Sequence, residues 1–140
     1  MKYHFDPIEF HMDDRAERYL DVFNDLLTQD NAIKGQINIS YVNSTEHVVA
    51  WHKHEKQTDY WVCIKGSFKV GLSDGEKTDF VYLSDRDPEV LEIPPEIYHG
   101  YKALEPNSIM LYYLSEKYDP SDEHRAKAGD FGESWETEDK

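Results

Sequence analysis

The sequence has little cysteine, few cations and no long apolar run. Its 140 residues contain one cysteine, Cys63, so a framework of disulfide bonds within the chain is excluded. Cys63 lies inside an apolar segment, where a packed thiol is much more common than a nucleophile. We therefore expect Cys63 to be buried and chemically inert.

Cations are scarce relative to acidic residues. Lysine and arginine together number 15 against 29 aspartates and glutamates, which gives a formal net charge of −14. Non-specific attraction to DNA, RNA or an anionic membrane requires clustered lysine and arginine, so partners of these classes are excluded. Any anionic ligand must be bound by local groups.

No apolar run approaches the roughly 20 residues of a membrane-spanning helix. The chain also shows no charged segment followed by an apolar one at its start, so we expect neither a signal peptide nor a membrane span. The expected location is the cytoplasm.

What is present is enough for one folded domain. Hydrophobic residues make up 39% of the chain and aromatic residues 14%, ten of them tyrosine, which favours a packed core over disorder. We expect a single domain over residues 1–140, with an N-terminal arm (1–34), a barrel core (35–115) and a C-terminal tail (116–140).

From residue 35 onward, short apolar runs alternate with turn residues, a pattern typical of β-sandwiches and barrels. The runs predict an all-β fold with strands at residues 36–42, 48–54, 60–65, 68–72, 80–83, 90–93 and 109–114.

The two ends of the chain carry weaker patterns. Apolar residues recur at helical spacing over residues 16–27 behind Asp13 and Asp14, which predicts a short N-terminal helix. In the tail, Phe131 and Trp135 are the only large apolar residues after Pro120. We expect an extended tail that these two rings hold in place, with residues 136–140 frayed.

The segment from Trp51 to Gly66 carries the clearest chemical signal. Side chains alternate between the faces of a strand, so His52 and His54 point the same way, and Asp59 begins the next strand within reach. Such a constellation can hold a metal ion or move a proton.

The spacing of these residues resembles the first motif of the cupin superfamily, and segment 93–100 (IPPEIYHG) resembles the second. The resemblance implies a jelly-roll barrel, also called a double-stranded β-helix. It also implies that His52, His54, Asp59 and His99 lie together on the inner surface as metal ligands. Three imidazoles and one carboxylate suit a divalent transition metal, namely Fe, Mn, Ni, Zn or Cu.

Within the cupins the chain resembles the dTDP-4-dehydrorhamnose 3,5-epimerase family and related dTDP-sugar isomerases. The resemblance rests on an ordered series of landmarks: 13–16 (DDRA), 36–40 (QINIS), 51–52 (WH), 93–95 (IPP), 99–100 (HG), 110–112 (MLY), 118–120 (YDP), Asp130 and Trp135.

This resemblance implies a nucleotide-sugar site and, by analogy, a homodimer. It implies that His52 is the general base, Tyr112 the general acid on the opposite face of the sugar, and Asp130 the carboxylate that orients His52. A neutral imidazole can accept a proton next to a ketone at neutral pH. The expected substrate-binding residues are Arg15, Gln36, Asn38, His99, Trp51 and Trp61.

The chain departs from the epimerase pattern at two cations. Val49 stands where the family has an arginine, and Asp59 stands near the position of a family lysine. A divalent ion at Asp59 could replace the lost positive charge as a Lewis acid. His54, in place of a common glutamine, resembles the ketoisomerases that carry His-x-His on this strand.

Three functions therefore follow from the sequence. The first is a nucleotide-sugar epimerase or isomerase that acts on a 4-keto-6-deoxy sugar and uses no nucleotide cofactor. The second is a metal-dependent cupin isomerase, lyase or dioxygenase acting on a small polar substrate. The third is a non-catalytic barrel that binds a sugar or another small molecule through its aromatic rings.

Overall fold

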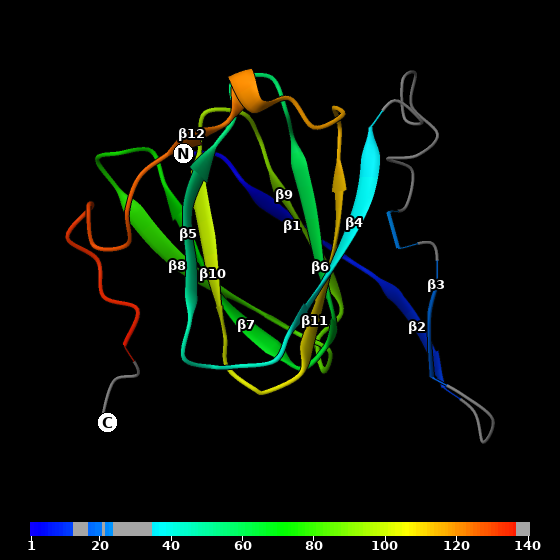
Figure 1. Cartoon of the computed structure of the whole chain (residues 1–140). Helices are drawn as coiled ribbons and strands as arrows, with labels where there is room; N and C mark the ends of the chain where they lie inside the picture. The colour runs from blue at the N-terminus through cyan, green and yellow to red at the C-terminus, as the bar shows by residue number, and fades with distance from the viewer. Residues whose placement is uncertain (13–16, 21, 24–34, 137–140) are drawn as a thin grey trace.

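The computed structural model describes residues 1–12, 17–20, 22–23 and 35–136. Two antiparallel five-stranded sheets face each other and form a barrel (Figure 1). In spatial order the first sheet consists of β1 (His4–Pro7), β9 (Glu89–Ile93), β6 (Asp59–Lys65), β11 (Ser108–Leu114) and β4 (Gln36–Val42). The second consists of β12 (His124–Arg125), β5 (Val48–Lys53), β10 (Tyr98–Ala103), β7 (Ser67–Ser73) and β8 (Thr78–Ser84).

This architecture confirms the predicted all-β barrel. Each of the seven expected strands is present, with bounds that differ by two residues or fewer at each end. The sequence pattern does not predict β10, because this strand contains Gly100 and two charged or titratable side chains, His99 and Lys102, instead of an apolar run. β10 nevertheless pairs with both β5 and β7, so it lies inside its sheet.

The N-terminal residues form strands where the sequence predicted a helix. β1 pairs with β9 at the edge of the first sheet, and β2 (Glu9–Met12) pairs with β3 (Glu17–Leu20) as a separate ribbon. The predicted helix is therefore wrong over residues 17–20. Pairing with β2 provides the backbone hydrogen bonds of this segment. An apolar run this short is compatible with the period of a helix and with that of a strand. The other residues of that prediction lie outside the described ones, apart from Val22 and Phe23. Within the described residues, no helix is long and apolar enough for a membrane span.

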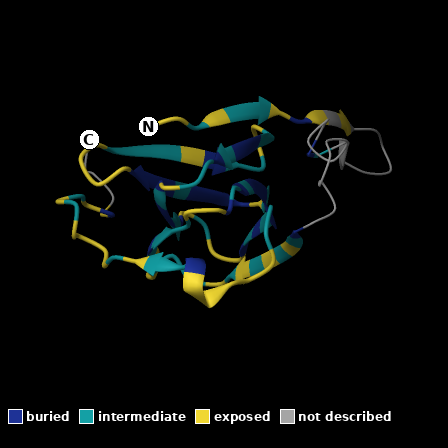
Figure 2. Cartoon of the chain, turned by 90° about the horizontal axis from the view of Figure 1, so that it is seen from above, coloured by how far each residue is buried: buried dark blue, intermediate teal, exposed yellow. Residues whose placement is uncertain are grey.

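The main core fills the space between the two sheets, where Figure 2 shows most of the buried residues. Side chains on β6 alternate between the inside and the outside of the barrel. Asp59, Trp61 and Cys63 point inward, and each is at most 4% exposed. Tyr60 and Val62 point to the outer face, where Val62 packs in a second cluster with Ile8 and Phe23 of the N-terminal segment. β6 thus supplies Asp59 to the polar cavity and Cys63 to the apolar core.

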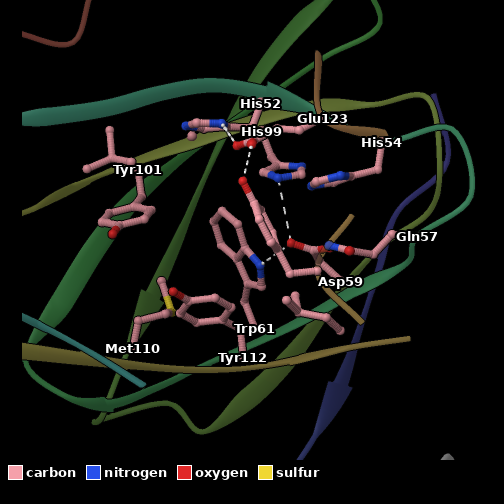
Figure 3. Close-up of a pocket in the computed structure, with 14 residues that line it drawn as sticks. His52, His54, Gln57, Asp59, Trp61, His99, Tyr101, Met110, Tyr112 and Glu123 are labelled. Atoms are coloured by element: carbon pink, nitrogen blue, oxygen red, sulfur yellow. Dashed lines mark hydrogen bonds and ion pairs between the residues drawn. The ribbon is translucent and has the colours of Figure 1, made fainter. Parts of the chain in front are cut away.

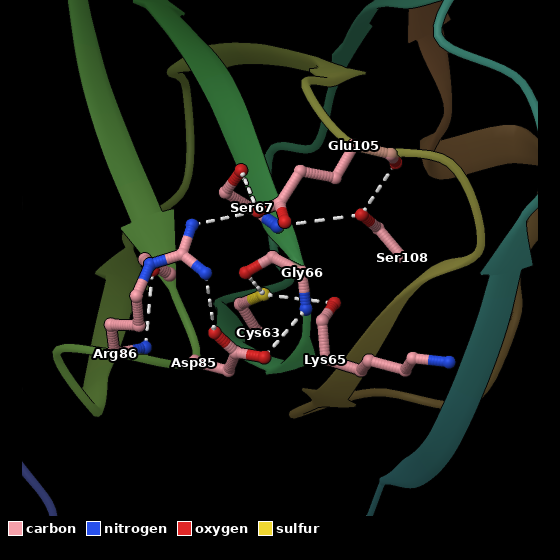
Figure 4. Close-up of polar contacts among 9 residues, drawn as sticks. Cys63, Lys65, Gly66, Ser67, Asp85, Arg86, Glu105 and Ser108 are labelled. Carbon is pink, nitrogen blue, oxygen red and sulfur yellow. Dashed lines mark hydrogen bonds and ion pairs between the residues drawn. The ribbon is translucent and has the colours of Figure 1, made fainter.

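A hydrogen-bond network closes the apolar end of the barrel (Figure 4). Gly66 adopts a φ of 82° in the turn between β6 and β7, and its N–H donates to the Asp85 carboxylate at 2.9 Å. The Cys63 thiol donates to the carbonyl of Gly66 at 3.2 Å, and burial raises its pKa to about 12. The expectation of a buried cysteine is confirmed.

The C-terminal segment returns to the barrel and adds a strand to it. A short 3₁₀ turn, η2 (Pro120–Asp122), leads into β12, which pairs with β5. Further on, the rings of Phe131 and Trp135 pack on Trp51, with centroid distances of 5.2 and 5.3 Å. The two rings hold the tail as expected, whereas residues 137–140 lie outside the described part.

Candidate active site

A cavity of about 200 Å³ opens at the polar end of the barrel, between the two sheets (Figure 3). Its walls combine imidazole, carboxylate, phenol and indole side chains from both sheets. The lining residues are Val49, His52, His54, Gln57, Asp59, Trp61, His99, Gly100, Tyr101, Met110, Tyr112, Leu114, Tyr118 and Glu123.

Three histidines meet on one wall because of strand alternation and register. His52 and His54 lie on the same side of the chain at the end of β5, and His99 of β10 is the antiparallel partner of His52. The His99 ring lies 5.4 Å from that of His54 and 6.5 Å from that of His52, measured between centroids. The structure thus brings together the three imidazoles that the sequence singled out.

Asp59 lies beside His99 and is held by two neutral donors. Its two oxygens accept from Gln57 Nε2 at 2.7 Å and from Trp61 Nε1 at 3.0 Å. His99 Nε2 lies 3.6 Å from the second oxygen, and both side chains are almost completely buried. Burial lowers the pKa of His99 to about 4, although the charge of Asp59 opposes the shift. His99 is therefore a neutral imidazole at neutral pH.

Three of the four predicted metal ligands fit a metal ion. Donor atoms of His54, Asp59 and His99 all lie within 4.8 Å of one another. His54 Nδ1 is 3.0 Å from the carbonyl oxygen of Asp122, so Nε2 is left to face the cavity. His52 does not belong to this group of mutually close donor atoms. The set is two imidazoles and one carboxylate.

Glu123 forms a pair with His52. Its Oε1 lies 3.0 Å from His52 Nδ1, and the same oxygen accepts from Arg125 Nη2 at 3.3 Å. The hydroxyl of Tyr118 donates to Oε2 at 3.5 Å. Burial alone would raise the pKa of Glu123, but the hydrogen bond and charge of Arg125, together with His52, lower it. An ionised Glu123 makes Nδ1 of His52 the protonated nitrogen and leaves Nε2 to accept a proton.

The structure pairs His52 with Glu123 and not with Asp130, the carboxylate that the resemblance implies. The Asp130 carboxylate accepts from the backbone N–H of Lys127 at 2.8 Å in an exposed turn, and Glu123 takes the predicted place. Pairing of β12 with β5 explains the difference, since Arg125 is the partner of His52 and Glu123 lies on the same face two residues earlier. No local sequence pattern distinguishes Glu123 from the other acidic residues of the tail.

Tyr112 faces the histidines from the opposite sheet. It lies on β11, and its hydroxyl shares a hydrogen bond of 2.9 Å with the Ser40 hydroxyl of β4. Trp61, on the neighbouring β6, contributes to the floor of the cavity. A ligand in the cavity would thus have an imidazole on one side and a phenol on the other.

The other predicted substrate-binding residues have different positions. Trp51 does not line the cavity: it alternates with His52, is fully buried on the outer face, and packs on Phe131 and Trp135. Gln36 and Asn38 hydrogen-bond to each other at 3.0 Å outside the set of lining residues. Arg15 lies outside the described residues.

Among the lining residues that were not predicted as site residues, Gln57, Tyr118 and Glu123 make hydrogen bonds within the site. Gln57 and Tyr118 lie in loops near strand ends, where side-chain direction does not follow a strand pattern. Tyr118 belongs to the segment 118–120 that carries part of the family resemblance. This resemblance was the one feature of the sequence that could have identified Tyr118 as a site residue.

Comparisons with known proteins agree with the fold and with the resemblance. The spore coat polysaccharide biosynthesis protein SpsL of Bacillus subtilis is 34% identical over 143 residues, which cover 91% of each chain. The probable low-salt glycan biosynthesis epimerase Agl13 of Haloferax volcanii is 38% identical over 86 residues. The dTDP-4-dehydrorhamnose 3,5-epimerase of Mycolicibacterium smegmatis is 30% identical over 86 residues, which cover 56% of this chain. The matches span only 54% of Agl13 and 43% of the latter epimerase.

Solved structures share the fold over nearly the whole chain. The dTDP sugar isomerase of Desulfovibrio desulfuricans matches with a TM-score of 0.81 and 20% identity, covering 95% of this chain and 90% of that one. The 3'-monoepimerase ChmJ of Streptomyces bikiniensis, in complex with dTDP-quinovose, matches with a TM-score of 0.81 and 16% identity, covering 95% and 74%. The predicted resemblance to dTDP-sugar epimerases and isomerases is confirmed. The family model described as FdtA: WxcM-like, C-terminal, matches residues 3–133, and the chain belongs to this family.

Proposed function

We propose that the protein is an epimerase or isomerase of a keto sugar carried on a nucleotide, acting by proton transfer next to the ketone. The observation that carries this proposal is the His52–Glu123 pair, which faces Tyr112 across the cavity. A base held in one tautomer and an acid on the other wall are what such a reaction requires.

In this mechanism Nε2 of His52 removes the proton from the carbon next to the ketone. The electron pair of that C–H bond moves to form an enolate, whose oxygen is the former carbonyl oxygen. Glu123 stabilises the imidazolium that forms, because its carboxylate accepts a hydrogen bond of 3.0 Å from Nδ1–H of His52. Return of a proton by Tyr112 to the opposite face of the same carbon gives epimerisation. Return by His52 to the former carbonyl carbon, with the hydroxyl proton of the first carbon passing to the enolate oxygen, moves the carbonyl group instead.

The relatives support a substrate of this class. SpsL and Agl13 are named for the biosynthesis of polysaccharide and glycan, and ChmJ is a 3'-monoepimerase solved with dTDP-quinovose. We take a 4-keto-6-deoxy sugar on dTDP as the first substrate to test.

Solvent exchange tests this function directly. The protein is incubated with dTDP-4-keto-6-deoxyglucose in deuterated water, and deuterium in the sugar is measured by mass spectrometry and NMR. We expect incorporation that falls about 100-fold or more in His52→Ala and in Tyr112→Phe, since each removes a proton-transfer group.

The exposed residues His47 and Tyr41 provide matched controls. His47→Ala and Tyr41→Phe should retain exchange close to that of the wild type. Equal exchange in His52→Ala and wild type would contradict the assignment of the base.

A second function is favoured by a separate observation, the grouping of His54, Asp59 and His99. These residues would hold a divalent metal, which would act as a Lewis acid on a substrate oxygen. The measurement is metal content of the purified protein by mass spectrometry, before and after chelator treatment. Stoichiometric metal that is lost in His54→Ala would support this function. Protein that takes up no metal and is unaffected by chelator would reject it.

We also propose that the protein is a homodimer. The outer face of the edge strand β4 carries three exposed apolar residues, Ile37, Ile39 and Tyr41, with exposed fractions of 58%, 50% and 71%. Burial of such a face against a second copy would remove this apolar surface from water. Light scattering after size-exclusion chromatography should give twice the chain mass, and Ile39→Lys should shift the mass toward the monomer.

A further inference from the structure

Arg125 shares one carboxylate oxygen with the catalytic base. Glu123 Oε1 accepts from His52 at 3.0 Å and from Arg125 at 3.3 Å. Arg125 is the antiparallel partner of His52, so both side chains lie on the same face of their sheet. The cation therefore lies next to the base without lining the main cavity.

The guanidinium of Arg125 has N–H donors that this contact with Glu123 does not use. Its side chain is 68% exposed, whereas that of Glu123 is 17% exposed. Arg125 and Lys127 also line a second hollow on β5, which shares His52 with the main cavity. An exposed arginine with a single hydrogen bond to a carboxylate has four further N–H donors to offer.

The charge of the molecule indicates which ligand these donors would meet. The chain carries a net charge of −14, and the described residues that line the main cavity include no lysine or arginine. Val49 and Asp59 stand where the epimerase resemblance places cations. A nucleotide diphosphate entering this region needs a local cation, and arginine binds phosphate oxygens in pairs more strongly than it binds one carboxylate oxygen.

We propose that Arg125 exchanges partners when substrate binds: it leaves Glu123 and binds the diphosphate of the nucleotide sugar, and Glu123 then bonds to His52 alone. Arg125 is thus a positioning residue that couples occupation of the diphosphate site to the orientation of the base. This inference rests on the proposed function.

The exchange has a consequence for affinity that a purely structural role would not produce. In the free protein Glu123 competes with the diphosphate for Arg125, so removing the charge of Glu123 should strengthen binding of dTDP. The gain should require Arg125, because competition is lost once the arginine is absent.

A double-mutant cycle of dTDP binding, measured by calorimetry on the full chain, tests this. We expect Arg125→Gln to weaken dTDP binding about tenfold or more, and Glu123→Gln to strengthen it about threefold or more. In the Arg125→Gln background, Glu123→Gln should change the affinity by less than about twofold. Glu55→Gln, at a side chain that is 60% exposed, controls for the loss of one negative charge and should have little effect.

The inference is overturned by any of three results: wild-type protein that does not bind dTDP, unchanged affinity in Arg125→Gln, or a gain from Glu123→Gln that persists without Arg125. The last result would mean that general charge repulsion alone explains the effect. Thermal unfolding of each variant shows whether a loss of binding reflects a loss of folding.

Kinetics separate this inference from the proposed function. With the keto sugar nucleotide, Arg125→Gln should raise KM about tenfold while kcat stays within about twofold, and Arg125→Lys should recover part of the KM effect. Equal KM in wild type and Arg125→Gln, with exchange that still depends on His52, would reject the role of Arg125 and leave the proposed function intact. Absence of exchange in the wild type would reject the function itself.

Discussion

At the residue scale, the proposed role of His52 as a base depends on the carboxylate next to it. Glu123 holds Nδ1 at 3.0 Å and is itself held by Arg125 and Tyr118. We expect Glu123→Gln to lower kcat for solvent exchange about tenfold to 100-fold, because an amide does not fix the tautomer or stabilise the imidazolium. The same deuterium assay measures this effect.

Asp130 provides the comparison for Glu123. Its carboxylate accepts from the backbone of Lys127 in an exposed turn, so Asp130→Asn should keep kcat within about twofold of the wild type. A loss in Asp130→Asn as large as that in Glu123→Gln would show that the resemblance had identified the correct carboxylate and that the pairing with Glu123 is not the one used in catalysis.

Single residues could be predicted from the sequence where strand alternation determines direction. His52 and His54 point into the barrel as alternation predicts. The same rule places Trp51 on the opposite face, so its assignment to the substrate conflicted with the direction already given to His52. Glu123 could not be predicted, because its position depends on the pairing of β12 with β5 about 70 residues earlier in the chain.

At the scale of elements, the turn between β6 and β7 depends on a glycine. Gly66 has a φ of 82°, and a Cβ atom there would lie 2.1 Å from Ser108 Oγ. We expect Gly66→Ala to lower the free energy of unfolding by about 2–4 kcal/mol, since it combines left-handed backbone strain with a steric overlap. Urea denaturation followed by fluorescence measures the difference.

A matched variant at Gly75 separates the backbone strain from the steric overlap. It has a φ of 95°, but a Cβ atom there would meet nothing within 4 Å, so Gly75→Ala should lower stability by only about 1–2 kcal/mol. Equal losses in the two variants would mean that the neighbouring Ser108 side chain moves aside without a free-energy cost.

Elements could be predicted where their residues carried a periodic apolar pattern. β4 alternates between polar and apolar residues, β11 is a continuous apolar run, and both have the expected ranges within one residue. β10 and β12 contribute to the candidate site yet lack this pattern, because they carry polar side chains such as His99 and Arg125 in place of an apolar run. Functional residues replace the apolar residues by which a strand is usually identified.

At the scale of the whole molecule, the excess of acidic residues opposes the compact state. A net charge of −14 on 140 residues produces self-repulsion that dissolved salt screens within about 8 Å at physiological ionic strength. We expect the unfolding temperature to rise by a few degrees between low salt and about 0.3 M sodium chloride. Differential scanning calorimetry at neutral pH measures the shift, and a constant or falling temperature would show that local ion pairs outweigh the overall repulsion.

The position of β12 has a consequence for the order in which the protein becomes active during synthesis. The segment from Val49 to Tyr118 precedes β12 in the chain and supplies every other residue that lines the cavity, so a ribosome releases it first. The barrel and its three histidines are available before Glu123 and Arg125 emerge. The nascent chain therefore acquires most of the cavity first, and the carboxylate and cation next to His52 are the last parts of the site to be synthesised.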